Sequence, residues 1–149
     1  MVIRFLFFVP SRPLWDVAAF CVYGKKVNLL TENQYKMRKG EKLGYKTYVL
    51  HLLPNTLSGY NVCPQASPAC ISTCLNLSSH GRAAKAQAAR KRRTLLYFND
   101  REQFNSLLEA DINEAARLAR KENKTLCIRL NGTSDLPQMM KVGLIPIRQ

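Results

Sequence analysis

Three of the five cysteines in this chain lie within twelve residues, in the segment NVCPQASPACISTCL at 61–75. Their spacing is C-x6-C-x3-C, and the two prolines between them restrict the backbone. Thiolates are soft ligands that suit zinc and iron–sulfur clusters. The pattern therefore predicts that Cys63, Cys70 and Cys74 bind one shared metal ion or cluster. The alternative, three unrelated thiols that pack separately in an apolar interior, stays open.

Two kinds of centre fit these ligands. Adding His80 extends the spacing to C-x6-C-x3-C-x5-H and supplies the four ligands of a tetrahedral zinc site. Without His80, three thiolates leave one iron of a 4Fe-4S cluster open to an exogenous ligand. Spacing alone does not decide between zinc, a cluster and no metal. His51, the other histidine, lies in an apolar segment and is interpreted as a core residue. The sequence identifies no catalytic residue.

Two strands are expected on either side of the cysteines and the helices that follow them. The segment KTYVLHLL at 46–53 is rich in β-forming residues and largely apolar on both faces, which is typical of a central strand in a parallel sheet. The cysteine loop follows it and is expected to turn helical near residues 69–75. The second strand, TLCIRL at 125–130, leads into the polar loop NGTSD. Its Cys127, like Cys21, is interpreted as a buried thiol.

Two helices are expected between these strands. The first is alanine-rich and covers about residues 82–98. The second is capped by Asn99 or Asp100, and Asp100 with Gln103 resembles a capping box. It presents one apolar stripe from Phe104 to Ala119. A strand, two helices and a second strand make a crossover connection. The predicted fold class is therefore α/β, with a parallel sheet covered by helices.

The ends of the two strands suggest where a site would lie. Ligands bind outside the carboxyl ends of parallel strands. The cysteine loop follows the first strand and NGTSD follows the second, so we expect both loops to meet at one edge of the sheet. Asn131, Thr133, Ser134 and Asp135 would then place polar groups beside the thiolates. The alternative is that NGTSD is a turn with a helix cap.

The chain is strongly basic, with 23 Lys and Arg against 10 Asp and Glu and a net charge of +13. This charge favours a polyanionic partner such as nucleic acid or an acidic membrane. Residues 24–46 are expected to form a basic arm without regular structure, and the helix over 82–98 is expected to present cations, either to a phosphate backbone or only to solvent. These helix residues are Arg82, Lys85, Arg90, Lys91, Arg92 and Arg93. The alternative function is thus a zinc-stabilised, non-enzymatic nucleic-acid-binding protein.

Residues 1–23 differ from the rest because they are aromatic, poor in Lys and interrupted by prolines. The apolar run at residues 5–9 is too short for an export signal and cannot span a bilayer. We therefore expect a cytoplasmic protein with reduced thiols and no membrane partner. The odd number of cysteines also argues against a fully paired disulfide scaffold. The sequence leaves the oligomeric state open.

Four motifs of the chain recur in one known family: CPQASPACISTCLN, RLNGTSDLP, MRKGEKLGY and LPNTLSGYNVCP. In these motifs the chain resembles the gene product eighty-eight type, a family of uncharacterised phage and prophage proteins. The resemblance covers about residues 27–137, within a domain expected at 24–137. It leaves residues 1–23 as an N-terminal extension and residues 138–149 as a divergent tail. It implies a protein of the cytoplasm of a bacterial host cell.

More distantly, the cysteine loop and the SDL loop are similar to those of radical-SAM proteins, although the usual spacing there is C-x3-C-x2-C. This resemblance implies a partial (β/α) barrel, since a full barrel takes about 250 residues. It implies that Cys63, Cys70 and Cys74 hold a 4Fe-4S cluster. It also implies redox or radical chemistry on an unknown substrate. S-adenosylmethionine or the substrate would be lined by Asn131, Gly132, Ser134 and Asp135.

Overall fold

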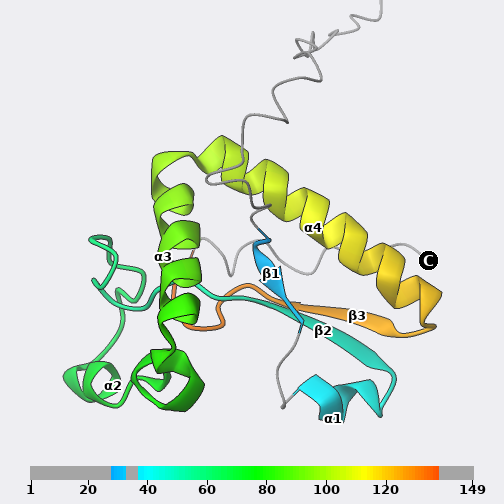
Figure 1. The fold of residues 1–149 in the computed structure, drawn as a ribbon, viewed down its shortest axis with the longest axis horizontal. Coiled ribbons are helices and arrows are strands. Elements are labelled where there is room, and N and C mark those ends of the chain that lie inside the picture. Colours follow the sequence, from blue (N-terminus) through cyan, green and yellow to red (C-terminus); the bar gives the residue numbers. More distant parts are fainter. Residues whose placement is uncertain (1–27, 33–36, 138–149) are drawn as a thin grey trace, which may run out of the picture.

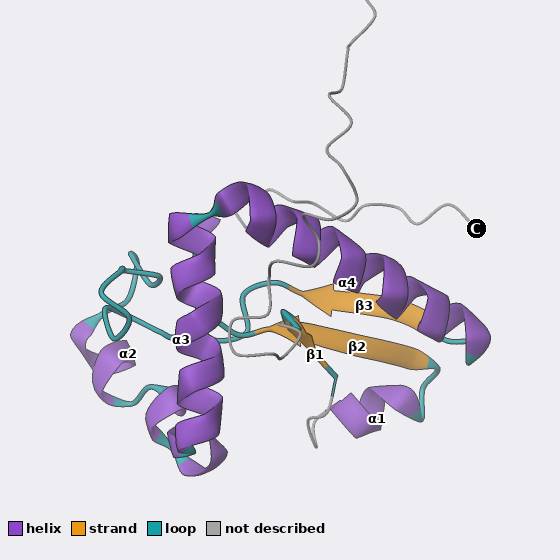
Figure 2. Ribbon diagram, turned by 45° about the horizontal axis from the view of Figure 1, so that its top comes forward, coloured by secondary structure: helices purple, strands orange, loops and turns teal. Residues whose placement is uncertain are grey.

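The computed structural model describes residues 28–32 and 37–137 (Figure 1). Their helices and strands form a small sheet with α4 running along it and α3 standing where the strands end. Figure 2 shows the same arrangement, with α2 on the far side of α3 from the sheet. In chain order the elements are β1 (Leu30–Thr31), α1 (Met37–Glu41), β2 (Tyr45–Leu50), α2 (Pro68–Ser72), the 3-10 turns η3 (Leu75–Leu77) and η4 (Ser79–Arg82), α3 (Ala84–Asn99), α4 (Arg101–Lys121) and β3 (Thr125–Arg129).

The sheet has three strands in the order β1-β2-β3, so β2 is central, as its two apolar faces predicted. β2 and β3 run parallel, with Tyr45 opposite Thr125 and Val49 opposite Arg129. The predicted crossover connection between these strands is therefore confirmed. β1 pairs antiparallel with the end of β2, which makes the described sheet mixed and open rather than wholly parallel. The fold class is mixed α/β.

The prediction that residues 24–46 form a basic arm without regular structure is partly wrong, because β1 and α1 lie within this range. Long-range contacts order this part of the chain. Leu29 and Leu30 are buried, and their backbone N–H groups donate to Asp111 Oδ2 on α4 at 2.7 and 3.1 Å. Arg93 Nε on α3 donates to the carbonyl of Asn28 at 3.0 Å. The local sequence carries no sign of these contacts, so a propensity argument could not find the strand.

Helices α3 and α4 meet at Asp100. The Asp100 side chain accepts a hydrogen bond from the Gln103 backbone N–H at 2.9 Å, which confirms the predicted N-cap of α4. The apolar stripe of α4 then packs against the sheet, with Phe104 fully buried in the same cluster as Tyr48 and Leu50. Within the described ranges, no helix is both long enough and apolar enough to cross a membrane.

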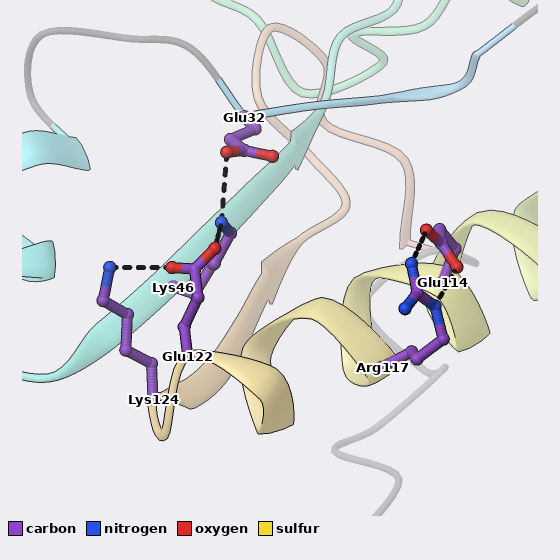
Figure 3. Close-up of polar contacts among 6 residues, drawn as sticks. All are labelled: Glu32, Lys46, Glu114, Arg117, Glu122 and Lys124. Atoms are coloured by element: carbon purple, nitrogen blue, oxygen red, sulfur yellow. Dashed lines mark hydrogen bonds and ion pairs between the residues drawn. The ribbon is translucent and has the colours of Figure 1, made fainter.

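A buried lysine ties the start of β2 to the end of α4 (Figure 3). Lys46 Nζ forms an ion pair with Glu32 at 3.2 Å and a short one with Glu122. The hydrogen bond to Glu122 raises the pKa of Lys46, although burial opposes the rise. Lys124, at 2.9 Å, and Lys46 together lower the pKa of Glu122 to about 2. Because the buried ammonium group has two carboxylate partners, it stays charged inside the fold.

The Asp111 contact generates a test of how the amino-terminal part of the domain is held. Asp111→Ala leaves the N–H groups of Leu29 and Leu30 without their carboxylate partner. We expect the free energy of unfolding in urea to fall by about 2 kcal/mol, which is the typical cost of losing a hydrogen bond to a charged group. Glu109→Ala removes an exposed carboxylate from the same helix and should change it little. Equal effects of the two variants would contradict the anchoring role of Asp111.

Candidate metal centre at the cysteine loop

The chain leaves β2 along a path that is fixed by α3. Leu52 and Leu53 are buried just beyond the strand. The Leu53 backbone N–H donates to Thr94 Oγ1 at 2.9 Å, and Thr94 itself is completely buried on α3. Because the first residues after the strand are held in this way, the following loop starts from a defined position at the carboxyl end of the sheet.

The loops after β2 and β3 meet at this edge, as the sequence predicted. The Gly132 backbone N–H donates to the Leu50 carbonyl at 3.0 Å, and the Asp135 N–H donates to the Val62 carbonyl at 2.8 Å. Gly132 passes so close to β2 that a Cβ atom would lie 2.5 Å from Val49 Cγ1 and 2.6 Å from His51 Nδ1. Only glycine therefore allows this approach, which brings the NGTSD segment onto the cysteine loop.

Cys63 occupies a half-buried position between the two loops. The Asn55 backbone N–H donates to Cys63 Sγ at 3.3 Å, and the thiol lies 3.9 Å from the Thr133 carbonyl oxygen. Burial raises the pKa of the Cys63 thiol; the N–H groups of Asn55 and Asp135 oppose this rise, while Cys74 and Cys70 add to it. Cys63 is therefore held between backbone groups of the loops after β2 and β3.

The loop that precedes Cys63 is also well anchored. Asn55 has a positive φ of 54°, and its carbonyl accepts from the Val62 N–H at 3.2 Å, which closes the loop at its base. Tyr60 stacks on Phe98 of α3 with ring centroids 4.3 Å apart, and its hydroxyl donates to Asn99 Oδ1 at 2.6 Å. Cys63 is thus positioned by contacts on both sides of its segment.

Cys70 and Cys74 are carried by the short helix α2 and the turn after it. Ser67 caps α2 by accepting from the Cys70 N–H at 3.2 Å, and the helix confirms the predicted turn near residues 69–75. Cys70 is exposed and Cys74 is half-buried. Within residues 28–32 and 37–137, no three or more Cys, His, Asp or Glu side chains are arranged to hold a metal ion. The backbone of His80 lies in η4, but its side chain is outside the described part of the chain.

A buried amide fixes the turn that follows Cys74 against α3. Asn76 is only 1% exposed. Its Nδ2 donates to Gln87 Oε1 at 3.2 Å, and its Oδ1 accepts a short hydrogen bond from Arg90. Gly81 passes against this turn, where a Cβ atom would lie 2.7 Å from the Leu75 carbonyl oxygen. Sequence reasoning missed this clamp; the signal was Gln87, an uncharged polar residue among the alanines of the basic helix.

The residues predicted to face a cofactor are bonded mainly within their own loop. Asn131 Oδ1 accepts from Ser134 Oγ at 2.8 Å and from the Leu136 N–H at 3.5 Å, while Asn131 Nδ2 donates to the Leu136 carbonyl at 3.1 Å. These bonds form the local turn that was the alternative interpretation of NGTSD. The Asp135 side chain is half-buried at the end of this loop.

The basic residues near α3 point in different directions. Arg93 is buried and bonded to Asn28, and Arg90 is half-buried against Asn76. Arg82 precedes the helix in η4, and its guanidinium folds back onto the Leu77 carbonyl. The outward cations of α3 are Lys85, Lys91 and Arg92. The cationic surface is therefore smaller than the sequence alone indicates.

His51 is buried, as its interpretation as a core residue predicted. Burial, together with the positive charges of Arg90, Arg93 and Arg129, lowers its pKa to about 4. The imidazole is therefore neutral at pH 7, and protonating it opposes folding.

This shift predicts an acid-sensitive step in stability. The folded-state pKa of His51 lies below the ordinary value of 6.5. The contribution of neutral His51 to the free energy of unfolding is therefore complete above pH 6.5 and is lost as the pH falls towards 4. NMR titration should give a His51 midpoint near pH 4, and His51→Gln should flatten the pH dependence of unfolding in that window. A midpoint near 6.5 would contradict the burial argument.

Comparison with known proteins identifies the family of the chain. A family model described as Gene product 88 matches residues 27–142. The match contains every described strand and helix and extends past Pro137, where the resemblance was expected to end. No curated protein and no solved structure matches the chain. With most of its length covered by the match, the chain belongs to the Gene product 88 family.

Proposed function

We propose that this protein binds an iron–sulfur cluster through Cys63, Cys70 and Cys74. The observation that carries the proposal is the position of Cys63. Its sulfur lies at the carboxyl ends of two parallel strands, accepts a backbone N–H from Asn55, and belongs to the same loop as Cys70 and Cys74. Thiolates from one loop at this edge of a sheet are suitable ligands for a cluster.

The donor set fits a cluster by its chemistry, because it consists of three thiols that are not in disulfides. The described arrangement is open, so Cys70 and Cys74 must approach Cys63 for all three to bind one centre. The segment that carries them allows this. Helix α2 has five residues, and none of them is buried. The chain is next anchored to α3 only at Asn76, after Cys74.

A bound cluster would supply one-electron chemistry and, with three protein ligands, an iron open to another molecule. The residues of the chain would tune it. The N–H group of Asn55 directs partial positive charge at the Cys63 sulfur, and hydrogen bonds to sulfur influence the reduction potential of a cluster. The Arg90 guanidinium, which interacts with Cys74, partly compensates the negative charge of the thiolates.

The finer version of this proposal follows the distant resemblance to radical-SAM proteins. In it the open sheet is part of a (β/α) barrel, and the loop of Asn131, Gly132, Ser134 and Asp135 borders S-adenosylmethionine or the substrate. Its support is the contact between this loop and the cysteine loop, through Asp135 and Val62. The reduced thiols that it needs would persist in the cytoplasm of a bacterial host.

Anaerobic purification tests the cluster directly. We expect reconstituted protein to be brown, with iron and acid-labile sulfide in equal amounts, and we expect Cys70→Ala to lose the visible absorbance. Cys127→Ala is the matched control, because Cys127 lies on β3, away from the cysteine loop in the sequence, and should keep the colour. Colourless protein with one equivalent of zinc would favour the alternative function. Metal-free protein with three reactive thiols would contradict both.

A second function, nucleic-acid binding, is favoured by one observation. Between Lys42 and Asn99 the chain contains no Asp or Glu, but it contains seven Lys and Arg. This acid-free segment includes the cysteine loop and α3, whose Lys85, Lys91 and Arg92 are exposed. Exposed cations in a segment without acidic residues would attract a phosphate backbone. In this version Cys63, Cys70, Cys74 and His80 would hold a structural zinc.

Salt dependence separates a real phosphate contact from a solvated helix. We expect binding to single-stranded DNA to weaken with salt, and Lys91→Ala with Arg92→Ala to reduce the slope of log affinity against log salt by about 1.4. Arg120→Ala with Lys121→Ala removes two exposed cations from α4 as a control and should leave the slope unchanged. Equal slopes for all three proteins would contradict a nucleic-acid site on α3.

A further inference from the structure

Three aliphatic side chains are exposed on α2 and on the 3-10 turn η3 that follows Cys74. Ile71 on α2 is 38% exposed, and Leu75 and Leu77 on η3 are 74% and 43% exposed. We name these three residues the leucine turn. Single exposed apolar side chains are common in soluble proteins, but three within seven residues need a physical reason.

Packing holds the leucine turn in this orientation. The Leu77 N–H donates to the Cys74 carbonyl at 2.8 Å, and the Ser78 N–H donates to the Leu75 carbonyl at 3.2 Å, so the backbone is a closed 3-10 turn. Asn76, between the two leucines, points inward to Gln87 and Arg90. Because Asn76 is fixed in the interior, its two neighbours stay in contact with solvent.

One cation contacts the leucine turn and others follow it along α3, while acidic residues are absent from this part of the chain. The Arg82 guanidinium contacts the carbonyl of Leu77 itself. Asn76 fastens the turn to α3, and the exposed Lys85, Lys91 and Arg92 of α3 follow the turn in the sequence. No Asp or Glu occurs between Lys42 and Asn99. Figure 1 shows α2 and the start of α3 at the opposite end of α3 from α4, the helix that carries four of the ten acidic residues.

We propose that the leucine turn inserts into the surface of an anionic lipid bilayer. A bilayer interface accepts a few aliphatic side chains at the acyl boundary while nearby cations contact the lipid headgroups. This site is beyond the proposed cluster and does not depend on it. It also revises the expectation of no membrane partner, which considered only segments that span a bilayer.

Other occupants fit the same surface less well. A specific protein partner usually covers about 800 Å² and is anchored by Trp, Tyr or Arg in pockets, whereas the leucine turn is small and has no aromatic ring. Single-stranded nucleic acid stacks on aromatic side chains, which are absent here. A second copy of the chain would bring like charges together, since its own leucine turn has the same cationic neighbours.

Vesicle co-sedimentation of the full chain tests the proposal. The vesicles contain either equal parts phosphatidylglycerol and phosphatidylcholine, or phosphatidylcholine alone. We expect the protein to sediment with the anionic vesicles only, and we expect Leu75→Asp with Leu77→Asp to lower its partition coefficient by about tenfold or more. Leu43→Asp is the matched control, because Leu43 is 76% exposed on the turn between α1 and β2 and should have no effect.

Several results would overturn the proposal. Unchanged binding of the Leu75→Asp, Leu77→Asp variant would show that charge alone holds the protein on vesicles. Equal binding to phosphatidylcholine would remove the role of the cations. If this variant kept its vesicle binding but lost DNA binding, the leucine turn would be assigned to nucleic acid. If it kept its vesicle binding but its molecular mass in solution halved, the leucine turn would be assigned to contact with a second copy. Circular dichroism verifies the fold of each variant, and Leu75→Ser repeats the test if the double variant is unfolded.

Discussion

The parallel pairing of β2 with β3 is the constraint on which the rest of the structure depends. It places Tyr45 opposite Thr125 and Val49 opposite Arg129, and the Gly132 N–H to Leu50 carbonyl bond continues it beyond the strands. Both strands therefore release their loops at the same edge. Without this register, the backbone groups of Thr133 and Asp135 would not lie beside Cys63, and the thiol would be an isolated group on an irregular loop.

Side-chain amides, a hydroxyl and backbone groups, rather than charge pairs, organise that edge. Thr94 fixes the exit from β2, Asn76 fastens the turn after Cys74 to α3, and the Asn131 side chain closes the loop after β3. Each of these groups is satisfied by direct hydrogen bonds, which is the condition for burying it without a large penalty. The ion pairs of Lys46 lie at the other end of β2, near its first residues.

The parts of the fold that local sequence specifies could be predicted. The two apolar strands, the Asp100 cap and the apolar stripe of α4 each follow from periodicity or from one side chain and a neighbouring N–H group. β1 could not be predicted, because its order comes from Asp111, more than eighty residues away. The inward direction of Arg93 depends on Asn28 in the same way. For the site, order along the chain was enough to bring the two loops together, but the internal bonding of Asn131 required the actual turn geometry.

The separation of β2 from β3 along the chain has a consequence for biosynthesis. A ribosome synthesises β2, the cysteine loop and the whole of α3 before any residue of β3. Pairings between such distant segments form late, because the intervening chain must first be closed into a loop. Thr133 and Asp135, which complete the surroundings of Cys63, emerge later still. The nascent chain therefore presents its thiols bare, and their enclosure is among the final events in maturation.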